Sequence, residues 1–472
     1  MKRLTIIALL LATAVADAQF IIDKGTESRH IDDDRMVDAK FIGRTEEGMI
    51  WVSQARNGWQ VVGADHQMEP TRTQGLKTNA EELLAATMSG DTVTLVLADC
   101  SHRQRTDLLI ARCTPLGEWK VDTLQTLAHG KKDNCLLWGA VSPSGNRIGL
   151  CSIVEYTESK QYSAFITLLT ADGMKEFRHE YPLGTMDQLR VTDDGRIVTI
   201  GTEQDGMTLH VIVNYADRSH AETNEALVTC EPPRELQIAN IIGSRMIAMG
   251  TISGSGFRGA EEFCGGTVAL AYDLAEARLA GFTIRPFHNE DINILYNKPT
   301  KKVQRDLLCE HATPLDFIPL PYGAAMAIGR NFEKISLADN GTEEHSFSRV
   351  GLHIMAVDTA ANVLWTRNLR RNDWQKGNPD LLNVGFATMG DTLCIVKSES
   401  RKLPAAYEIG KEAKMLKMGD KSNIVLYTIA PGGEVHKDIL EAKSKHSVLH
   451  LTKQFDIITV HGSRLRHIKL SR

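Results

Sequence analysis

The sequence predicts an all-β protein built from one repeated unit, and three observations support this prediction. Short runs rich in Val, Ile and Leu alternate with turns rich in Gly, Asp and Asn from residue 40 to the C-terminus. The same strand–turn–strand pattern recurs along the chain at regular intervals. No long amphipathic helical pattern competes with it. A repeat architecture, rather than several unlike domains, is therefore expected for the 472 residues.

One kind of hairpin carries a turn rich in Asp, Gly, Pro or Ala, followed by a partly alternating strand. A clear example is "HIMAVDTAANVLWTRNL", in which Trp365 follows the turn. The seven copies span residues 59–76, 108–124, 165–183, 209–227, 268–284, 353–369 and 424–440. Trp365 is thus one position in a repeated unit, and we expect it either to pack between neighbouring units or to shield the apolar edge of its hairpin.

A second kind of hairpin precedes each copy of the first. These hairpins span residues 40–55, 83–99, 136–153, 188–203, 238–253, 315–332 and 381–398. The turn pairs Ser89-Gly90, Asp194-Gly195 and Met389-Gly390 supply the positive φ that a tight hairpin requires. The second strand of each is apolar at consecutive positions, as in a strand that is buried on both faces.

Two hairpins together make a four-stranded antiparallel sheet of the size of a propeller blade, about 45 to 60 residues with its connections. Seven complete pairs occupy residues 40–440. A further hairpin at 448–462 and a strand at 465–470 supply three strands of an eighth sheet, which lacks its fourth strand. The segment 19–25, at the other end of the chain, reads as one unpaired strand. We therefore predict a single β-propeller of eight blades, with seven as the alternative, and a ring closed by the N-terminal strand.

The N-terminus has the pattern of a secretory signal peptide. Lys2 and Arg3 precede the apolar run "LTIIALLLATAVA", and Ala16-Asp17-Ala18 forms the cleavage site. The run is shorter than the ~20 residues of a membrane-spanning helix. We expect residues 1–18 to be removed and the propeller, 19–472, to be exported to the periplasm or the cell exterior. No Cys follows the cleavage site, which does not support a lipoprotein anchor.

Two long polar insertions, about 287–312 and 402–421, interrupt the repeat, and we expect both to lie on the surface. The net charge of −5 gives no basic field, so the composition does not indicate a nucleic-acid partner.

The hairpins resemble those of Bacteroidetes-type secreted β-propeller proteins of uncharacterised function. The resemblance is carried by "FIGRTEEGMIWVSQ", by "YGAAMAIGRNF" followed by the Trp365 hairpin, and by "NIVLYTIAPGGEVHKDIL". The middle element of that family usually begins Gly-Gly, whereas this chain has Gly323-Ala324-Ala325. The resemblance implies a secreted propeller in the cell envelope and implies no particular chemistry.

The sequence predicts no cofactor and assigns no catalytic residue. Quinoprotein propellers place a Trp at nearly every blade, but here only Trp365, and loosely Trp119, occupy that position. In "HIDDDR", Asp32, Asp33 and Asp34 are candidates for a hard cation such as Ca²⁺. They lack the Gly and the distal Glu of a calcium loop, so an acidic solvated linker is the favoured interpretation.

The eight Cys residues are scattered and show no zinc-ligand spacing. Cys135 and Cys151 fall nearly opposite each other across the hairpin 136–153, so they are candidates either for a disulfide or for a side-chain contact without a bond. Adjacent-strand geometry often disfavours the bridge. We expect most of the others to pack as small apolar side chains.

The function favoured by this pattern is non-enzymatic binding or scaffolding, with a protein or glycan of the cell envelope held on a loop-built face or at the central channel. The alternative is an envelope hydrolase or lyase with its site at the channel mouth. A third possibility is a structural component of a surface assembly that contacts its partner through 287–312. The oligomeric state and the identity of the partner are not predicted.

Overall fold

The computed structural model of the protein describes residues 21–24, 40–114, 117–180, 186–230, 233–254, 263–296, 312–337, 342–377, 382–401, 416–417, 422–452, 455–461 and 464–471. Within these ranges the chain forms strands β1 to β33 and one short helix, α1. No helix of the described residues has the length and apolar character needed to cross a membrane.

The strands form four-stranded antiparallel sheets that follow one another along the chain, and we number these sheets in chain order. The first four sheets are β2 (Lys40–Thr45), β3 (Gly48–Ala55), β4 (Gly58–Ala64) and β5 (Pro70–Lys77); β6 (Glu82–Ser89), β7 (Thr92–Asp99), β8 (Arg105–Cys113) and β9 (Lys120–Ala128); β10 (Asn134–Val141), β11 (Arg147–Tyr156), β12 (Gln161–Thr170) and β13 (Lys175–Glu180); and β14 (Gln188–Val191), β15 (Ile197–Asp205), β16 (Thr208–Ala216) and β17 (Ala221–Thr229).

The last four sheets have the same order, with two additions: α1 (Asn289–Tyr296) precedes the sixth sheet, and β28 (Leu416–Lys417) pairs in parallel with its outer strand. These sheets are β18 (Pro233–Ile242), β19 (Arg245–Gly254), β20 (Phe263–Asp273) and β21 (Arg278–Pro286); β22 (Ala312–Leu320), β23 (Gly323–Leu337), β24 (Glu343–Asp358) and β25 (Val363–Lys376); β26 (Val384–Met389), β27 (Thr392–Glu399), β29 (Ser422–Ile429) and β30 (Val435–Ser444); and β31 (Ser447–Leu451), β32 (Asp456–His461), β33 (Arg464–Ser471) and β1 (Ile21–Lys24).

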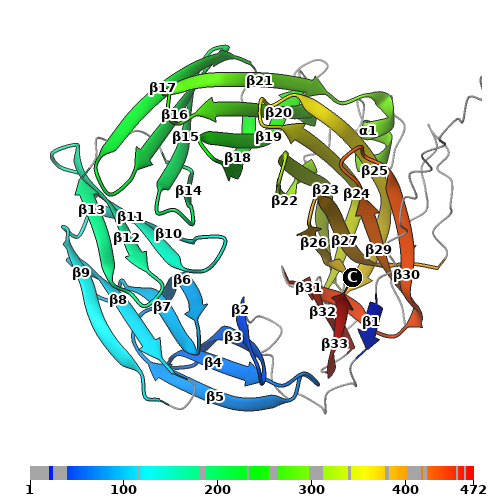
Figure 1. Cartoon of the computed structure of the whole chain (residues 1–472), viewed down its shortest axis with the longest axis horizontal. Helices are drawn as coiled ribbons and strands as arrows, with labels where there is room; N and C mark the ends of the chain where they lie inside the picture. Colours follow the sequence, from blue (N-terminus) through cyan, green and yellow to red (C-terminus); the bar gives the residue numbers. More distant parts are fainter. Residues whose placement is uncertain are drawn as a thin grey trace, which may run out of the picture.

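Figure 1 shows the sheets arranged around a common centre, with strands such as β14 and β18 innermost and β17 and β21 outermost. Consecutive sheets pack face to face, and each consecutive pair shares one cluster of buried apolar side chains. This radial arrangement of four-stranded antiparallel sheets is a β-propeller-type fold.

The continuous apolar runs of the second strands follow from burial on both faces. In β7, Val93, Leu95 and Leu97 belong to the cluster shared with the first sheet. Val96 and Ala98, which point the other way, belong to the cluster shared with the third sheet. Polar–apolar alternation is therefore missing in these strands, as the sequence predicted.

The two kinds of hairpin expected from the sequence are present throughout the described residues. The turn residues Gly90, Gly195 and Gly390 have φ values of 55°, 90° and 62°, in the left-handed region that Gly adopts without strain. Trp365 is 5% exposed and packs in the cluster between the sixth and seventh sheets, as expected.

The expectation of a surface insertion at 287–312 is wrong for its first part. Phe287, Ile292 and Leu295 are buried in the cluster between the fifth and sixth sheets, because α1 turns one apolar side toward β24. Residues 297–311 lie outside the described residues, as does the insertion 402–421 apart from β28.

Candidate functional site

The candidate site lies along the turns that join the two innermost strands of each sheet. Polar contacts connect these turns from one sheet to the next. Thr87 of the second sheet donates to the carbonyl of Gly145 in the third at 2.7 Å. Asn240 of the fifth sheet donates to the carbonyls of Leu320 and Gly323 in the sixth, at 2.9 and 2.7 Å. We call this series of turns, from 142–146 to 320–323, the turn rim.

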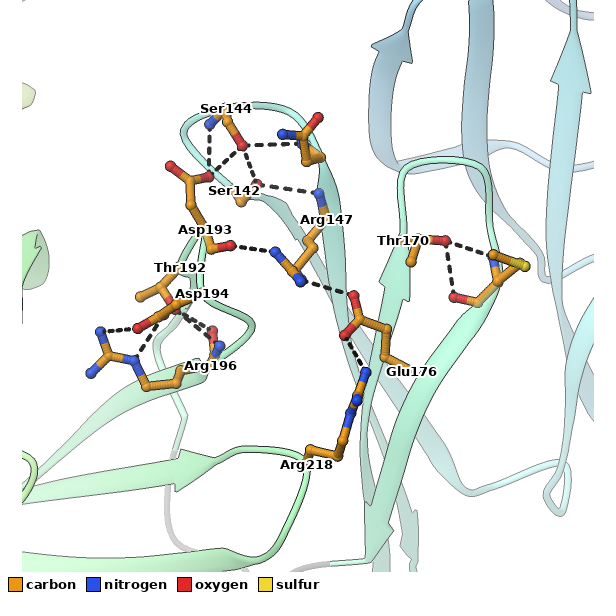
Figure 2. Close-up of polar contacts among 12 residues, drawn as sticks. Ser142, Ser144, Arg147, Thr170, Glu176, Thr192, Asp193, Asp194, Arg196 and Arg218 are labelled. Atoms are coloured by element: carbon orange, nitrogen blue, oxygen red, sulfur yellow. Dashed lines mark hydrogen bonds and ion pairs between the residues drawn. The ribbon is translucent and has the colours of Figure 1, made fainter.

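Asp193, in the β14–β15 turn, holds the third and fourth sheets together (Figure 2). Its Oδ1 accepts hydrogen bonds from the backbone N–H of Ser144 at 2.9 Å and from the Ser144 hydroxyl at 2.6 Å. Its backbone carbonyl accepts a further bond from the Arg147 guanidinium. Arg147 also pairs with Glu176 at 2.8 Å. The turn of the fourth sheet is thus fixed on the hairpins of the third.

Asp194 has a different partner. Both of its carboxylate oxygens lie 2.9 Å from the Arg196 guanidinium, in a two-point ion pair. The remaining nitrogen of that guanidinium donates to the carbonyl of Gly243, in the turn of the fifth sheet, at 2.8 Å. Arg196 therefore connects the fourth sheet to the fifth.

Beside these contacts lies a pocket of about 550 Å³. It is formed by the innermost strands β10, β14, β18 and β22 and by the turns that follow β10 and β14, so four consecutive sheets contribute to it. Its lining residues are Val141, Pro143, Arg190, Val191, Thr192, Asp193, Asp194, Arg196, Ile238, Ala239, Asn240, Ile241, Asp316, Phe317 and Pro319. Charges of both signs alternate with apolar surface, which is the mixture found in sites for polar ligands.

Arg190 is the least committed charge of this lining. Its Nε donates to the carbonyl of Ile238 at 3.2 Å, and no described residue accepts a hydrogen bond from its two terminal nitrogens. Burial lowers the pKa of the guanidinium from its usual range, and the nearby charge of Asp316 opposes this shift. A guanidinium remains charged even so, and its donors are available to an acceptor that enters the pocket.

The two adjacent carboxylates of the pocket are ionised at neutral pH. Burial alone would raise the pKa of Asp193, but its hydrogen bonds from Ser144 hold it below the usual range. For Asp194, hydrogen bonds from Arg196 and Thr192 likewise outweigh burial and keep the pKa low. A general acid needs the opposite shift, so neither carboxyl is arranged to donate a proton.

A second group of titratable side chains is buried between the sixth and seventh sheets. The Lys397 ammonium lies 3.2 Å from Glu399 and donates to the carbonyl of Arg370 at 2.6 Å. Burial lowers the pKa of Lys397 and raises that of Asp373. Lys397, Glu399 and Asp373 are each at most 5% exposed, which leaves no surface for a substrate. We interpret this group as structural.

A cation site was also expected from the sequence, in the N-terminal segment. Asp32, Asp33 and Asp34 lie outside the described residues. Within the described ranges, no three His, Cys, Asp or Glu side chains are grouped so that they could hold a metal ion.

The predicted disulfide between Cys135 and Cys151 is wrong. The register of β10 and β11 places Cys135 opposite Val154 and Cys151 opposite Trp138. Because this offset is odd, the two side chains point to opposite faces of the sheet. Cys135 packs toward the second sheet and Cys151 toward the fourth, so they are not bonded to each other.

Sequence reasoning did not identify Arg190, Asp193 or Asp316 as site residues. Each belongs to a different strand or turn, and no local motif links them. The one available signal was position: a charged residue on an innermost strand, beside a turn, lies near the centre of a propeller.

Comparisons with known proteins add little about function. No protein-family model matches the chain, and no curated protein matches it in sequence. Among solved structures, the WD40 domain of SCAP from fission yeast aligns at 9% identity over 95% of this chain and 98% of its own, with a TM-score of 0.39. An uncharacterised protein from Listeria monocytogenes EGD-e aligns at 12% identity over 81% and 90%, with a TM-score of 0.35.

The polysaccharide lyase Uly1 aligns at 9% identity over 84% of this chain and 91% of its own, also with a TM-score of 0.35. These low scores carry no argument about this chain. The description of the fold rests on its own sheets.

Proposed function

We propose that this chain is an exported, closed, eight-bladed β-propeller that binds a protein or glycan partner of the cell envelope through the pocket on its turn rim, without catalysing a reaction. The basic and apolar N-terminal segment, residues 1–18, supports export. The function rests on one observation: Arg190 presents hydrogen-bond donors with no described acceptor in a pocket built from four consecutive sheets.

Three contacts between the two ends of the chain support a closed ring of eight blades. β1 pairs with β33 in antiparallel register, from Ile21 opposite Ser471 to Lys24 opposite Ile468. The eighth sheet also shares a buried cluster with the first, in which Trp51 packs with Ile458. Arg44 of the first sheet pairs with Asp456 of the eighth at 3.4 Å.

The protonation states of two carboxyl groups in the pocket favour binding over a hydrolase or lyase reaction. Asp193 and Asp194 are both held as carboxylates by donors of the protein itself. Such groups supply fixed charge and orientation, whereas a lyase or hydrolase acting by general acid–base chemistry needs a carboxyl or imidazole poised to exchange protons. Apolar surface from Ile241 and Phe317 beside these charges fits a sugar face or a peptide side chain.

The test compares partner capture by three forms of the mature chain: wild type, Arg190→Ala and Arg178→Ala. Arg178 is an exposed guanidinium above the Phe165 ring on the outer strands of the third sheet, so it is a matched control away from the pocket. Each form is immobilised and exposed to an envelope extract, and what is retained is identified and then titrated directly by calorimetry.

A partner that binds wild type and Arg178→Ala, and that binds Arg190→Ala at least tenfold more weakly, supports the proposal. A tenfold change corresponds to about 1.4 kcal/mol, the scale of one lost charge-assisted hydrogen bond. Equal binding by all three forms would place the interaction elsewhere and contradict it. Turnover of the captured glycan or peptide by the wild type would favour the enzymatic alternative.

A further inference from the structure

Arg190 is held in place by the main chain of the neighbouring sheet. Gln188 and Arg190 lie two residues apart on β14, so their side chains share one face of the fourth sheet. The backbone N–H of Ile238, on β18, donates to Oε1 of Gln188, and the carbonyl of Ile238 accepts from Nε of Arg190 at 3.2 Å. The Gln188 amide also donates to Oε1 of Gln237 at 3.1 Å. The guanidinium is therefore positioned before any ligand enters the pocket.

The bond from Nε determines which side of the Arg190 guanidinium a ligand can use. A carboxylate can bind a guanidinium through Nε and one terminal nitrogen, or end-on through both terminal nitrogens, Nη1 and Nη2. In Arg190, Nε is already occupied, and among the described residues Nη1 and Nη2 form neither a hydrogen bond nor an ion pair. The end-on pair of donors is thus left for the ligand, and it matches the two oxygens of one carboxylate.

The other charges of the lining limit how acidic the ligand can be. Acidic side chains outnumber basic ones there, with Asp193, Asp194 and Asp316 against Arg190 and Arg196. A ligand with several negative charges in the pocket is therefore repelled. A single carboxylate placed against the guanidinium of Arg190 meets its one cation with unused donors. The group that fits is one carboxylate on an otherwise neutral molecule.

The rest of the lining is matched by hydroxyl groups and an apolar surface on the ligand. Asp193 is exposed and ionised, so its carboxylate accepts hydrogen bonds and donates none. Phe317 and Ile241 are only partly buried and supply apolar surface to the pocket. A sugar ring carries both features in one unit, with hydroxyl groups around its edge and C–H groups on its faces. The side chain of an acidic peptide has no hydroxyl groups beside its carboxylate.

We propose that this site recognises a uronate, a sugar whose carboxylate binds end-on to Nη1 and Nη2 of Arg190, within an otherwise neutral glycan. This inference rests on the proposed function, because it takes the pocket as the binding site. It narrows the partner from a protein or glycan to an acidic glycan. The carboxylate lies at Arg190, the ring hydroxyls reach Asp193, and one face of the ring lies along the apolar lining at Phe317.

The experiment titrates the mature chain with three probes in a calorimeter. The first is a xylobiose that carries one terminal glucuronate. The second is the same trisaccharide with its carboxylate reduced to a hydroxymethyl group, and the third is a blocked tripeptide with one Glu side chain. We expect the acidic trisaccharide to bind at least about tenfold more tightly than the other two probes, because only it combines the carboxylate with hydroxyl groups.

Three variants locate the contact. Arg190→Ala should bind the acidic and the reduced trisaccharide equally, whereas Arg178→Ala, away from the pocket, should keep the wild-type preference. Asp316→Asn removes one negative charge from the lining and keeps the Oδ1 that accepts from the backbone N–H of Phe317 at 2.8 Å. Its affinity for the acidic trisaccharide should rise about twofold or more, with no such rise for the reduced form.

The inference is overturned if the wild type does not bind the acidic trisaccharide, or binds it no better than the reduced form or the tripeptide. A preference for the acidic form that persists in Arg190→Ala overturns it as well. The proposed function survives these results if the partner captured from the envelope extract still binds Arg190→Ala at least tenfold more weakly than the wild type. Capture that is independent of Arg190 contradicts the proposed function, and this inference with it.

Discussion

Replacing Trp365 by Ala tests whether this residue fastens two sheets together. Its side chain is 5% exposed in the cluster between the sixth and seventh sheets, and its Nε1 donates to the carbonyl of Pro431, in the β29–β30 turn, at 3.0 Å. A buried Trp removes about 150–250 Å² from water, worth about 4–6 kcal/mol at ~25 cal/mol per Å². The hydrogen bond adds about 1 kcal/mol. Unfolded chains already bury part of this area, so we expect a loss of about 4 kcal/mol in the free energy of unfolding.

A double-mutant cycle with Gly433 makes this prediction specific. Gly433 has a φ of 86°, and a Cβ added there would lie 2.9 Å from both Cβ and Cγ of Trp365. In the wild type, Gly433→Ala therefore suffers a clash in addition to the strain of about 1–2 kcal/mol of a left-handed backbone. In the Trp365→Ala background the contact with Cγ is lost, whereas the contact with the Cβ that Ala keeps, and a contact with Nη2 of Arg367 at 2.7 Å, remain. We expect a coupling of about 1 kcal/mol between the two substitutions.

The assay is urea denaturation of the four proteins followed by far-ultraviolet circular dichroism, which does not rely on the removed Trp. The reasoning is refuted if Trp365→Ala lowers the free energy of unfolding by less than about 1 kcal/mol, or if the two substitutions are additive within about 0.5 kcal/mol. Either result would mean that the contact between Trp365 and the next sheet contributes little.

Three further predictions concern acid stability, backbone packing and closure. Burial alone would raise the pKa of Asp291, but hydrogen bonds from His353 and Asn368 hold it below its usual range. The stability that this carboxylate contributes is therefore present above about pH 4 and is lost as the pH falls toward the folded pKa. The free energy of unfolding, measured from pH 7 to 3, should fall less in Asp291→Asn than in the wild type. A Cβ added at Gly351 would lie 2.6 Å from the Ile294 carbonyl oxygen, whereas a Cβ added at Gly90 would have no neighbouring atom within 4 Å, and both residues have positive φ. Gly90→Ala should therefore cost only the backbone strain, about 1–2 kcal/mol, and Gly351→Ala should cost clearly more. Equal losses of stability in thermal melts would contradict this. Removing residues 19–24 should expose the edge of β33 and increase aggregation, measured by light scattering, relative to the intact mature chain. Equal aggregation of the two forms would argue against closure by β1.

Hairpins were predictable because their signals are local. Turn glycines such as Gly195 and Gly390 mark where the chain reverses, and apolar runs between them mark strands. The prediction that Cys135 lies opposite Cys151 was wrong because it depended on the register of the two strands, which is set by the length of their turn. Val141 pairs with Ile148, so the turn that contains Pro143 is longer than a tight hairpin and shifts the ladder by three residues. An odd shift moves a side chain to the other face, and no sequence pattern at this turn fixes its length.

The burial of α1 had a partial signal that the polar composition of 287–312 obscured. Ile292 and Leu295 are three residues apart, which places them on one side of a helix. The pocket had no signal in the sequence, because Arg190 and Phe317 come together only through the packing of separate sheets. Long-range contacts of this kind depend on the order and angle of the sheets, which a hairpin pattern does not specify.

The contacts of the turn rim hold the pocket in shape before a ligand binds. Asp193 and Arg196, which line it, are the same residues that fix the fourth sheet to its neighbours, so the site is preformed, and its lining comes from four sheets. A ligand that binds only the folded chain stabilises it by about 2.7 kcal/mol at a hundred times its dissociation constant. A partner of this pocket should therefore raise the melting temperature of the wild type, and the Arg190→Ala variant should need more ligand for the same rise. Stabilisation of both forms at the same ligand concentration would show that the partner binds at another surface.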